Sequence, residues 1–385
     1  MKARNKSLRG VLRVPAVVLC SLLLGAFCGF VFAKTGLFEL TEGLSKTGVI
    51  LADLWMLAAF ALTFFLNIAL HEAGHLIFGL LSGYGFVSYR LGSLMWMREN
   101  GRIVLKRFSL AGTGGQCLMS PPGGPDGDFP LMMYNFGGAA VNLATAALLG
   151  ALTAIGAVRG SLVFLPLCLF GGLSALYLAV VNGIPLVLGP VPNDGWNALH
   201  LAADPQARRA FWVTLKVNEL QHRGVRLKDM SAEWFALPSE EAMKNGLIAT
   251  SAVLAENRAM DACDLSAAEA IIPAILADSC GAADLYKKLA VCDAVTCALI
   301  REGAAADVSP LKEKGTAPFL RRMSDFPSVL RTRYAEALLK NRDETAAAKV
   351  LAHFDRVALS YPAPADIAAE RDLMALIRKT YDEAK

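Results

Sequence analysis

Charged residues are scarce in this chain of 385 residues. Asp, Glu, Lys and Arg together make up 19% of it, against about 25% in ordinary soluble domains. The deficit is local, because long uncharged runs lie before residue 200 and the remainder has the charge density of a soluble domain. The net charge of +4 gives no reason to expect a nucleic acid partner. The composition therefore predicts a membrane core followed by a globular tail.

The sequence also lacks the motifs of several common sites. Its eight cysteines form no Cys-x-x-Cys pair. We interpret those in the spans and in the tail as small apolar residues, not as disulfides or as a second zinc site, and the role of Cys117 is open. The glycine-rich segment Ala111–Gly115 lacks the Gly-Lys-Ser/Thr ending of a phosphate-binding loop and a following helix. We therefore expect a flexible loop here, which continues through residues 121–125.

Four apolar segments, the second of them completed by its polar continuation, are long enough to cross a hydrocarbon core about 30 Å thick, which takes roughly 20 helical residues. They are Val14–Ala33, Leu54–Leu70, Leu131–Val158 and a segment from Ser161 to Gly183. The first has an alternative interpretation, because Val31-Phe32-Ala33 resembles the cleavage site of a signal peptide. Its apolar run is long for a signal sequence, which favours a retained span.

Basic residues set the expected orientation. Five precede the first span and five lie between the second and third spans; they are Lys2, Arg4, Lys6, Arg9 and Arg13, then Arg90, Arg98, Arg102, Lys106 and Arg107. Under the positive-inside rule both groups face the cytoplasm. We therefore expect a multi-pass protein of the cell (plasma) membrane whose N-terminus, active-site side and C-terminal domain are cytoplasmic.

The most informative motif is His71-Glu72-Ala73-Gly74-His75. Two imidazoles four residues apart lie on one face of a helix and can hold one metal ion, with Glu72 beside it. The alternative is chance, but the chain has only five histidines, and ionisable side chains at membrane depth are costly and usually functional. We interpret His71 and His75 as zinc ligands and Glu72 as the base that takes a proton from the attacking water.

A catalytic zinc site needs a third protein ligand. Asp194, in Asn193-Asp194-Gly195, is the best candidate, because it follows the fourth span, whose inner end should lie near that of the second. The preceding glycines and prolines disfavour a regular helix and suit a backbone that lines a cavity. Asn-Asp-Gly is also ordinary turn chemistry. The competing ligands are His200 and, with a different topology, Glu39 or Glu42.

Together these motifs resemble the site-2 protease family of intramembrane zinc metalloproteases. That family has a later motif of Asn, Pro three residues on, and Asp-Gly. Asn182 and Pro185 fit its start and Asp194-Gly195 fits its end, although more residues separate Pro185 from Asp194 than is usual. The family's Gly-Pro-x-x-Asn corresponds to Gly138-Ala139-Ala140-Val141-Asn142, with Ala in place of Pro. The resemblance covers about residues 48–200.

The resemblance implies a zinc endopeptidase that cuts membrane-spanning or membrane-associated peptides. His71, His75 and Asp194 would hold Zn²⁺, Glu72 would be the base, and Asn182 and Asn142 are expected beside the ligands or the substrate. The alternative is a membrane scaffold or transporter that binds metal without proteolysis. Glu72 favours the protease, since a structural zinc site needs no such acid and usually has four protein ligands.

The loop between the second and third spans is predicted to contain a β-hairpin. Residues 99–102 centre on Asn-Gly, the preferred pair for a two-residue turn between strands 94–98 and 103–108. This pairing puts Trp96 opposite Leu105. The edge of the hairpin either accepts substrate as an added strand or serves only as structural cover.

Residues 201–385 predict helices, because Ala, Leu, Glu and Lys dominate and apolar residues recur at helical spacing. Residues 262–276 and 341–355 resemble each other, and each is expected to start the second helix of a hairpin with Asp264 or Asp343 near its N-cap. The likeness favours tetratricopeptide-like pairs, with an unrelated helical bundle as the alternative. Either form would recruit a protein partner or stabilise the core.

The predicted architecture is therefore mainly α. An N-terminal segment and the first span occupy residues 1–47. A polytopic helical membrane core with a small β-hairpin insertion, similar to a site-2 protease, covers 48–200. A helical cytoplasmic domain covers 201–385.

Overall fold

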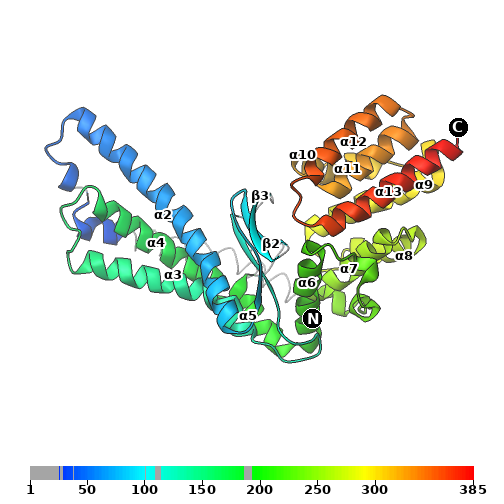
Figure 1. The fold of residues 1–385 in the computed structure, drawn as a ribbon. Helices are drawn as coiled ribbons and strands as arrows, with labels where there is room; N and C mark the ends of the chain where they lie inside the picture. The colour runs from blue at the N-terminus through cyan, green and yellow to red at the C-terminus, as the bar shows by residue number, and fades with distance from the viewer. Residues whose placement is uncertain (1–25, 27–28, 38, 100, 109–113, 186–192) are drawn as a thin grey trace, which may run out of the picture. The chain divides into compact units, whose positions relative to one another are not determined.

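The computed structural model describes residues 26, 29–37, 39–99, 101–108, 114–185 and 193–385, which are mainly helical (Figure 1). Most of the predicted first span lies outside this part of the chain. By their internal contacts the residues divide into two units, Met1–His71 with Gly138–Val181 and Glu72–Gly137 with Asn182–Lys385. Each change of unit falls inside a helix, so the division does not follow the linkers.

Within the described residues, three helices are long and apolar enough to cross a membrane: α2 (Lys46–Leu81), α3 (Leu131–Ala154) and α4 (Phe164–Gly183). They correspond to the second, third and fourth predicted spans. Helix α2 extends beyond the predicted 54–70 at both ends, because no helix breaker interrupts it before Gly83, whose φ is +86°. Helix α4 ends two residues before Pro185, as expected for the restricted residue that precedes a proline.

Polar side chains join these helices within the first unit. The Asn67 amide on α2 donates hydrogen bonds of 2.8 Å to the Gly171 carbonyl oxygen and to Ser174 Oγ on α4. The Asn142 amide on α3 donates to the Asn67 carbonyl oxygen at 3.3 Å. These amides are buried among apolar helices, where the hydrogen bonds across the helices satisfy them and fix the packing.

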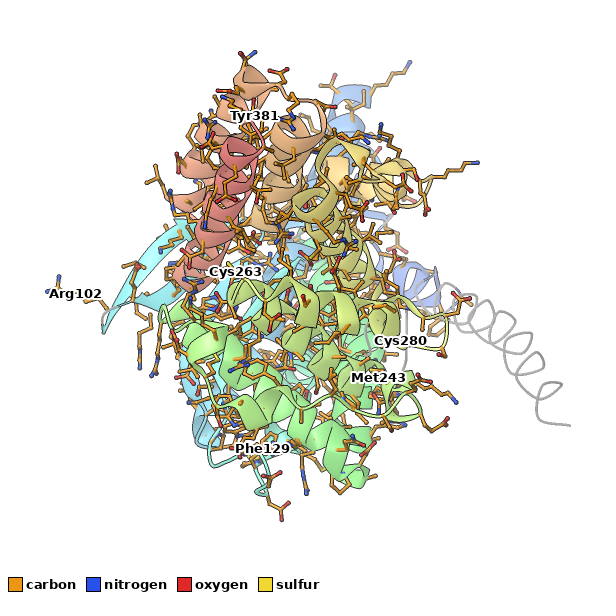
Figure 2. All side chains as sticks on the ribbon, turned by 90° about the vertical axis from the view of Figure 1, so that its right-hand side faces the viewer. Arg102, Phe129, Met243, Cys263, Cys280 and Tyr381 are labelled. Carbon is orange, nitrogen blue, oxygen red and sulfur yellow. The ribbon has the colours of Figure 1, made fainter. Side chains whose placement is uncertain are left out.

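The second unit contains a four-stranded antiparallel sheet of order β3-β2-β1-β4. Its strands are β1 (Gly85–Leu91), β2 (Leu94–Glu99), β3 (Arg102–Arg107) and β4 (Gly115–Ser120). The predicted hairpin and its register are confirmed, with Trp96 opposite Leu105 and Arg102 at its projecting tip (Figure 2). The expectation of a hairpin alone was incomplete. Gly115, predicted to lie in a loop, instead begins β4 and pairs with Leu91.

Helices make up most of the rest of the second unit. The α-helices are α5 (Asp194–Ala203), α6 (Pro205–His222), α7 (Gly246–Asp261), α8 (Leu265–Leu276), α9 (Asp284–Glu302), α10 (Thr316–Arg322), α11 (Pro327–Ala335), α12 (Glu344–Ala358) and α13 (Pro364–Glu383). Short 3-10 helices are η1 (Glu39–Thr41, in the first unit), η2 (Leu227–Asp229), η3 (Ala232–Phe235), η4 (Ala242–Lys244), η5 (Gly303–Ala305) and η6 (Ser309–Lys312), and η7 (Glu336–Lys340) is a π-helix.

The sheet and the following helices share a hydrophobic core. Cys117 and Met119 of β4 belong to the same buried cluster as Trp212 and Val217 of α6. Packing therefore joins the sheet to helices beyond residue 200, whereas composition alone divides the chain at that point. The second unit is thus built on the sheet as well as on the helical tail.

The capping predictions in the tail are confirmed. The Asp264 carboxylate accepts a hydrogen bond from the Ala267 amide at the start of α8. The Asp343 carboxylate does the same for the Ala346 amide at the start of α12. Capping by Asp satisfies amides that have no partner within the helix. The tetratricopeptide-like pairing stays a prediction.

Candidate metal centre

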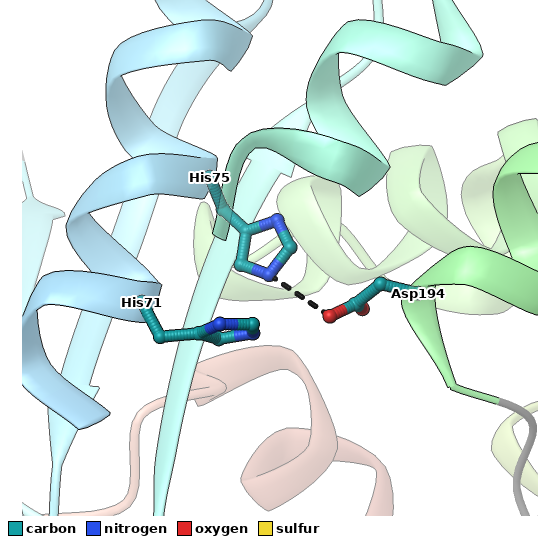
Figure 3. A group of neighbouring side chains, drawn as sticks. All are labelled: His71, His75 and Asp194. Atoms are coloured by element: carbon teal, nitrogen blue, oxygen red, sulfur yellow. Dashed lines mark ion pairs between the residues drawn. The ribbon is translucent and has the colours of Figure 1, made fainter. Parts of the chain in front are cut away.

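Helix α2 supplies two imidazoles to one place. His71 and His75 are four residues apart on it, and both are buried, at 8% and 7% exposure. Residues at this spacing share a helix face, so the helix itself orients the two rings together. Figure 3 shows both side chains on the same side of α2.

Helix α5 presents the third group from its first residue, Asp194. The Asn193 side chain caps this helix by accepting a hydrogen bond from the Trp196 amide at 2.9 Å. The Asn193 amide also donates to the Ile184 carbonyl oxygen at 2.6 Å. A carboxylate in the first turn is favoured by the helix dipole. Asn-Asp-Gly is therefore the start of a helix, not a turn alone.

Gly195 allows α5 to begin against the end of α4. A Cβ atom at this position would lie 2.2 Å from the Gly183 carbonyl oxygen and 3.1 Å from that of Asn182. Backbone cannot give way as a flexible side chain does, so only glycine fits. The contact fixes where α5 starts, and hence where the Asp194 carboxylate lies. Asn182, expected beside the ligands or the substrate, is partly buried in the last turn of α4.

The structure brings His71, His75 and Asp194 together (Figure 3). One ligand atom from each lies within 4.8 Å of the others, and His75 Nε2 is 3.3 Å from Asp194 Oδ2. Zinc–ligand bonds of about 2.0–2.1 Å in a tetrahedron separate neighbouring ligand atoms by about 3.3–3.4 Å. The His75–Asp194 separation matches this spacing, and two imidazoles and one carboxylate within 4.8 Å of one another could hold a divalent metal ion.

The competing ligands do not join this cluster. His200 is exposed, and its ring stacks on Trp196 with the ring centroids 4.2 Å apart. Its Nδ1 atom lies 3.1 Å from the Trp196 carbonyl oxygen. Neither Glu39 nor Glu42 belongs to the cluster found among the described residues.

Hydrogen bonds hold both imidazoles by their Nδ1 atoms. His75 Nδ1 lies 2.8 Å from the Tyr134 carbonyl oxygen, and His71 Nδ1 lies 3.2 Å from Asn142 Oδ1. Because a carbonyl oxygen only accepts, a proton must sit on His75 Nδ1, and Nε2, which lies 3.3 Å from Asp194 Oδ2, is the atom that faces the candidate metal position. The same arrangement with Asn142 as acceptor gives His71 that tautomer. Such partners orient metal-binding histidines and raise their basicity.

Two glycines of α3 make room for this face of α2. A Cβ atom on Gly138 would lie 2.5 Å from His71 Cε1, and one on Gly137 would lie 2.6 Å from the Gly74 carbonyl oxygen. Small residues let membrane helices approach closely. Gly138 is the first residue of the Gly-x-x-x-Asn motif that ends at Asn142. In this motif Gly138 leaves space for the His71 ring, and Asn142 accepts a hydrogen bond from it.

Glu72 faces the sheet. It is partly buried, and its negative charge contributes, after burial, to raising the pKa of Tyr89 on β1 to about 12. Burial first and the charge of Glu72 second also raise the pKa of Cys117 on β4. Sequence reasoning placed Glu72 beside the metal but missed these neighbours, because β1 and β4 were not predicted.

The site thus has three side chains that could hold a divalent ion, and an acid follows the first of them in the sequence. Hydrogen bonds orient both imidazoles. No family model matches the chain, and neither a curated protein nor a solved structure matches it.

Proposed function

We propose that the protein is an intramembrane zinc metalloprotease of the site-2 type, which hydrolyses peptide bonds of membrane-associated substrates. The observation that carries the proposal is the convergence of His71, His75 and Asp194 with Glu72 directly after the first ligand. The site is built on two helices, α2 and α5. Helix α2 is long and apolar enough to cross a membrane.

The proposed mechanism divides the work among these residues. A zinc ion bound by the three ligands would polarise the scissile carbonyl and lower the pKa of its bound water to about 7. Glu72 takes a proton from the attacking water and passes it to the nitrogen of the leaving amine. Asn142 and the Tyr134 carbonyl oxygen hold the two imidazoles in the metal-binding tautomer. Proton transfer by Glu72 does not require it to bind the metal.

The number of ligands favours catalysis over the alternative, a non-proteolytic scaffold or transporter. Structural zinc sites are usually closed by four protein ligands, whereas catalytic sites keep one position for water or substrate. The cluster found in the described part of the chain offers three. A scaffold would also have no use for an acid at position 72.

The sheet supports a proposal for how substrate is presented. Strand β3 is at one edge of the sheet, beside β2, and Ile103 and Leu105 on it are exposed apolar residues. A helical peptide bond is shielded by the helix's own hydrogen bonds, so a substrate must unwind before it is cut. We propose that an unwound segment adds to this edge as an extended strand.

Comparing fragments of membrane proteins in cells tests the proposed function. Cells that express the wild-type protein should accumulate cleavage products that are absent with Glu72→Gln, which keeps the side-chain shape but removes the proton acceptor. Glu42→Gln, an exposed acid outside the cluster, is the matched control and should keep the products. Identical fragments with wild type and Glu72→Gln would overturn the proposal.

A further inference from the structure

Strand β4 begins against the side chain of Glu72. A Cβ atom at Gly115 would lie 2.7 Å from Glu72 Cγ, 2.8 Å from Oε1 and 3.1 Å from Cδ. Ordinary van der Waals contacts of a Cβ atom begin at 3.4 Å. The absent side chain of Gly115 therefore leaves the space that the Glu72 carboxyl group occupies.

The backbone itself does not require glycine at this position. Gly115 is not among the residues with positive φ, and it pairs in regular antiparallel register with Leu91. An L-amino acid fits such a strand conformation. The three atoms nearest to a Cβ atom at this position all belong to Glu72, so we attribute the requirement for glycine to the acid.

A buried arginine contacts the backbone of Gly115, beside this space. Arg90 on β1 is 1% exposed, and its guanidinium donates to the carbonyl oxygens of Gly92 at 2.8 Å and of Gly115 at 3.4 Å. Burial lowers the pKa of Arg90, and the negative charge of Glu72 opposes that shift. A buried cation is stable only where hydrogen bonds and an opposite charge compensate its lost hydration. Arg90 thus ties the start of β4 to β1 and sets a positive charge toward Glu72.

We propose that Gly115 and Arg90 are positioning residues for Glu72. Gly115 provides the space in which the carboxylate sits, and Arg90 fixes the β4 backbone that forms one side of that space. The inference rests on the proposed function, because it concerns the orientation of the base. It assigns the sheet a second task beside substrate binding, which is to hold Glu72 toward the attacking water.

The substitution Gly115→Ala tests this role, because its closest clashes are with the Glu72 side chain and not with the backbone. The added methyl group should displace the carboxylate and leave the backbone in place. Gly85→Ala in β1 is the matched control, since its Cβ atom would lie 3.6 Å from Ser120 Cβ, an ordinary contact. Both variants should keep about one zinc per chain, as three protein ligands imply, and the wild-type melting temperature.

Kinetics then separate the two variants. Gly115→Ala should lower kcat by roughly 100-fold with KM unchanged, as a misplacement of about 1 Å can do, whereas Gly85→Ala should match wild type. Shortening the acid should relieve the clash, so Glu72→Asp should cost less activity in the Gly115→Ala background than in wild type. Arg90→Lys should retain more kcat than Arg90→Met.

The outcomes distinguish this inference from the proposed function. Three outcomes would overturn the positioning role while wild type still cleaves. They are a wild-type kcat in Gly115→Ala, additive effects of Gly115→Ala and Glu72→Asp, and loss of zinc from Gly115→Ala. Fragments that are the same for wild type and Glu72→Gln would instead overturn the protease itself.

Discussion

At the scale of single residues, the two imidazoles differ in what holds them. The His75 ring is fixed by a backbone carbonyl, that of Tyr134, which no substitution removes directly. The His71 ring is fixed by the side chain of Asn142, which is fully buried and also reaches the Asn67 carbonyl oxygen. The orientation of His71 can therefore be weakened by changing one residue that does not touch the metal.

Asn142→Ala should lower zinc affinity about 10–100-fold, the usual effect of removing such a partner. Titration of the purified protein with zinc against a competing chelator measures this. Asn135→Ala is the control, because Asn135 is a buried asparagine of the same helix whose amide donates to the Leu131 carbonyl oxygen. Equal affinities for the two variants would show that Asn142 does not hold His71 for metal binding.

The ligands themselves give a second test. Wild type should bind about one zinc per chain, and Ala at position 71, 75 or 194 should lower the occupancy, because a catalytic site has no spare protein ligand. Metal analysis of the purified protein measures this. His200→Ala should keep full occupancy, since His200 lies outside the cluster. Full zinc content in Asp194→Ala would exclude Asp194 as a ligand.

At the scale of elements, local sequence motifs predicted secondary structure well. No motif indicated the pairings between segments that lie far apart in the chain. The hairpin register followed from one Asn-Gly turn, and the helix face of His71 and His75 followed from their spacing. The pairing of β1 with β4 runs from Leu91 opposite Gly115 to Gly85 opposite Ser120. The β2–β3 hairpin lies between these two strands in the sequence, so no single turn motif connects them. For this reason Gly115 was predicted to lie in a loop. Glu72, whose side chain it contacts, lies still further away in the sequence.

The third ligand shows the same limit. Asp194 was favoured because it follows a span that should end near the second one, but His200 was consistent with the same reasoning. The choice depends on Gly195 packing against Gly183 and on the Asn193 cap. Both features are tertiary contacts of a helix start, and the residues alone are also typical of a turn.

Helix α13 carries two acids that predict a pH dependence of stability. Burial, followed by the charges of Glu370 and Asp261, raises the pKa of Asp366 to about 7, although the Gln221 side chain donates a hydrogen bond to it. Burial also raises the pKa of Glu370 to about 7, against the opposing charge of Arg331. Carboxyls in an unfolded chain have a pKa of about 4.

Between the unfolded pKa of about 4 and the folded pKa of about 7, the folded state keeps protons that the unfolded state has lost. Stability therefore falls as pH rises through this range. The melting temperature in detergent should therefore be higher at pH 6 than at pH 8. Asp366→Asn removes one titrating group while keeping its shape, and should reduce the difference. Arg378→Gln, at a partly exposed residue of the same helix whose closest ion pair is with Asp382, should leave it unchanged. A melting temperature that rises from pH 6 to pH 8 would contradict the raised pKa values.

At the scale of the whole molecule, the distribution of basic residues predicts on which side of the membrane the candidate site lies. The positive-inside rule predicts that the basic residues before the first predicted span and those between α2 and α3 face the cytoplasm. We then expect helix α2 to run inward, with its histidines in its last three turns. Water must reach these residues, because the proposed hydrolysis consumes it. We therefore expect cleavage near the cytoplasmic surface of the membrane.

Cysteine labelling with a membrane-impermeant reagent tests this orientation in a variant that lacks the native thiols. Arg102→Cys at the hairpin tip and Lys385→Cys at the C-terminal end should be labelled in inverted vesicles and protected in intact cells. Arg159→Cys, in the exposed connection between α3 and α4, should show the reverse. A permeant reagent that labels all three in both preparations confirms that each thiol is accessible. Labelling of position 102 in intact cells would reverse the topology, and the histidines at the end of α2 would then act from the outer face.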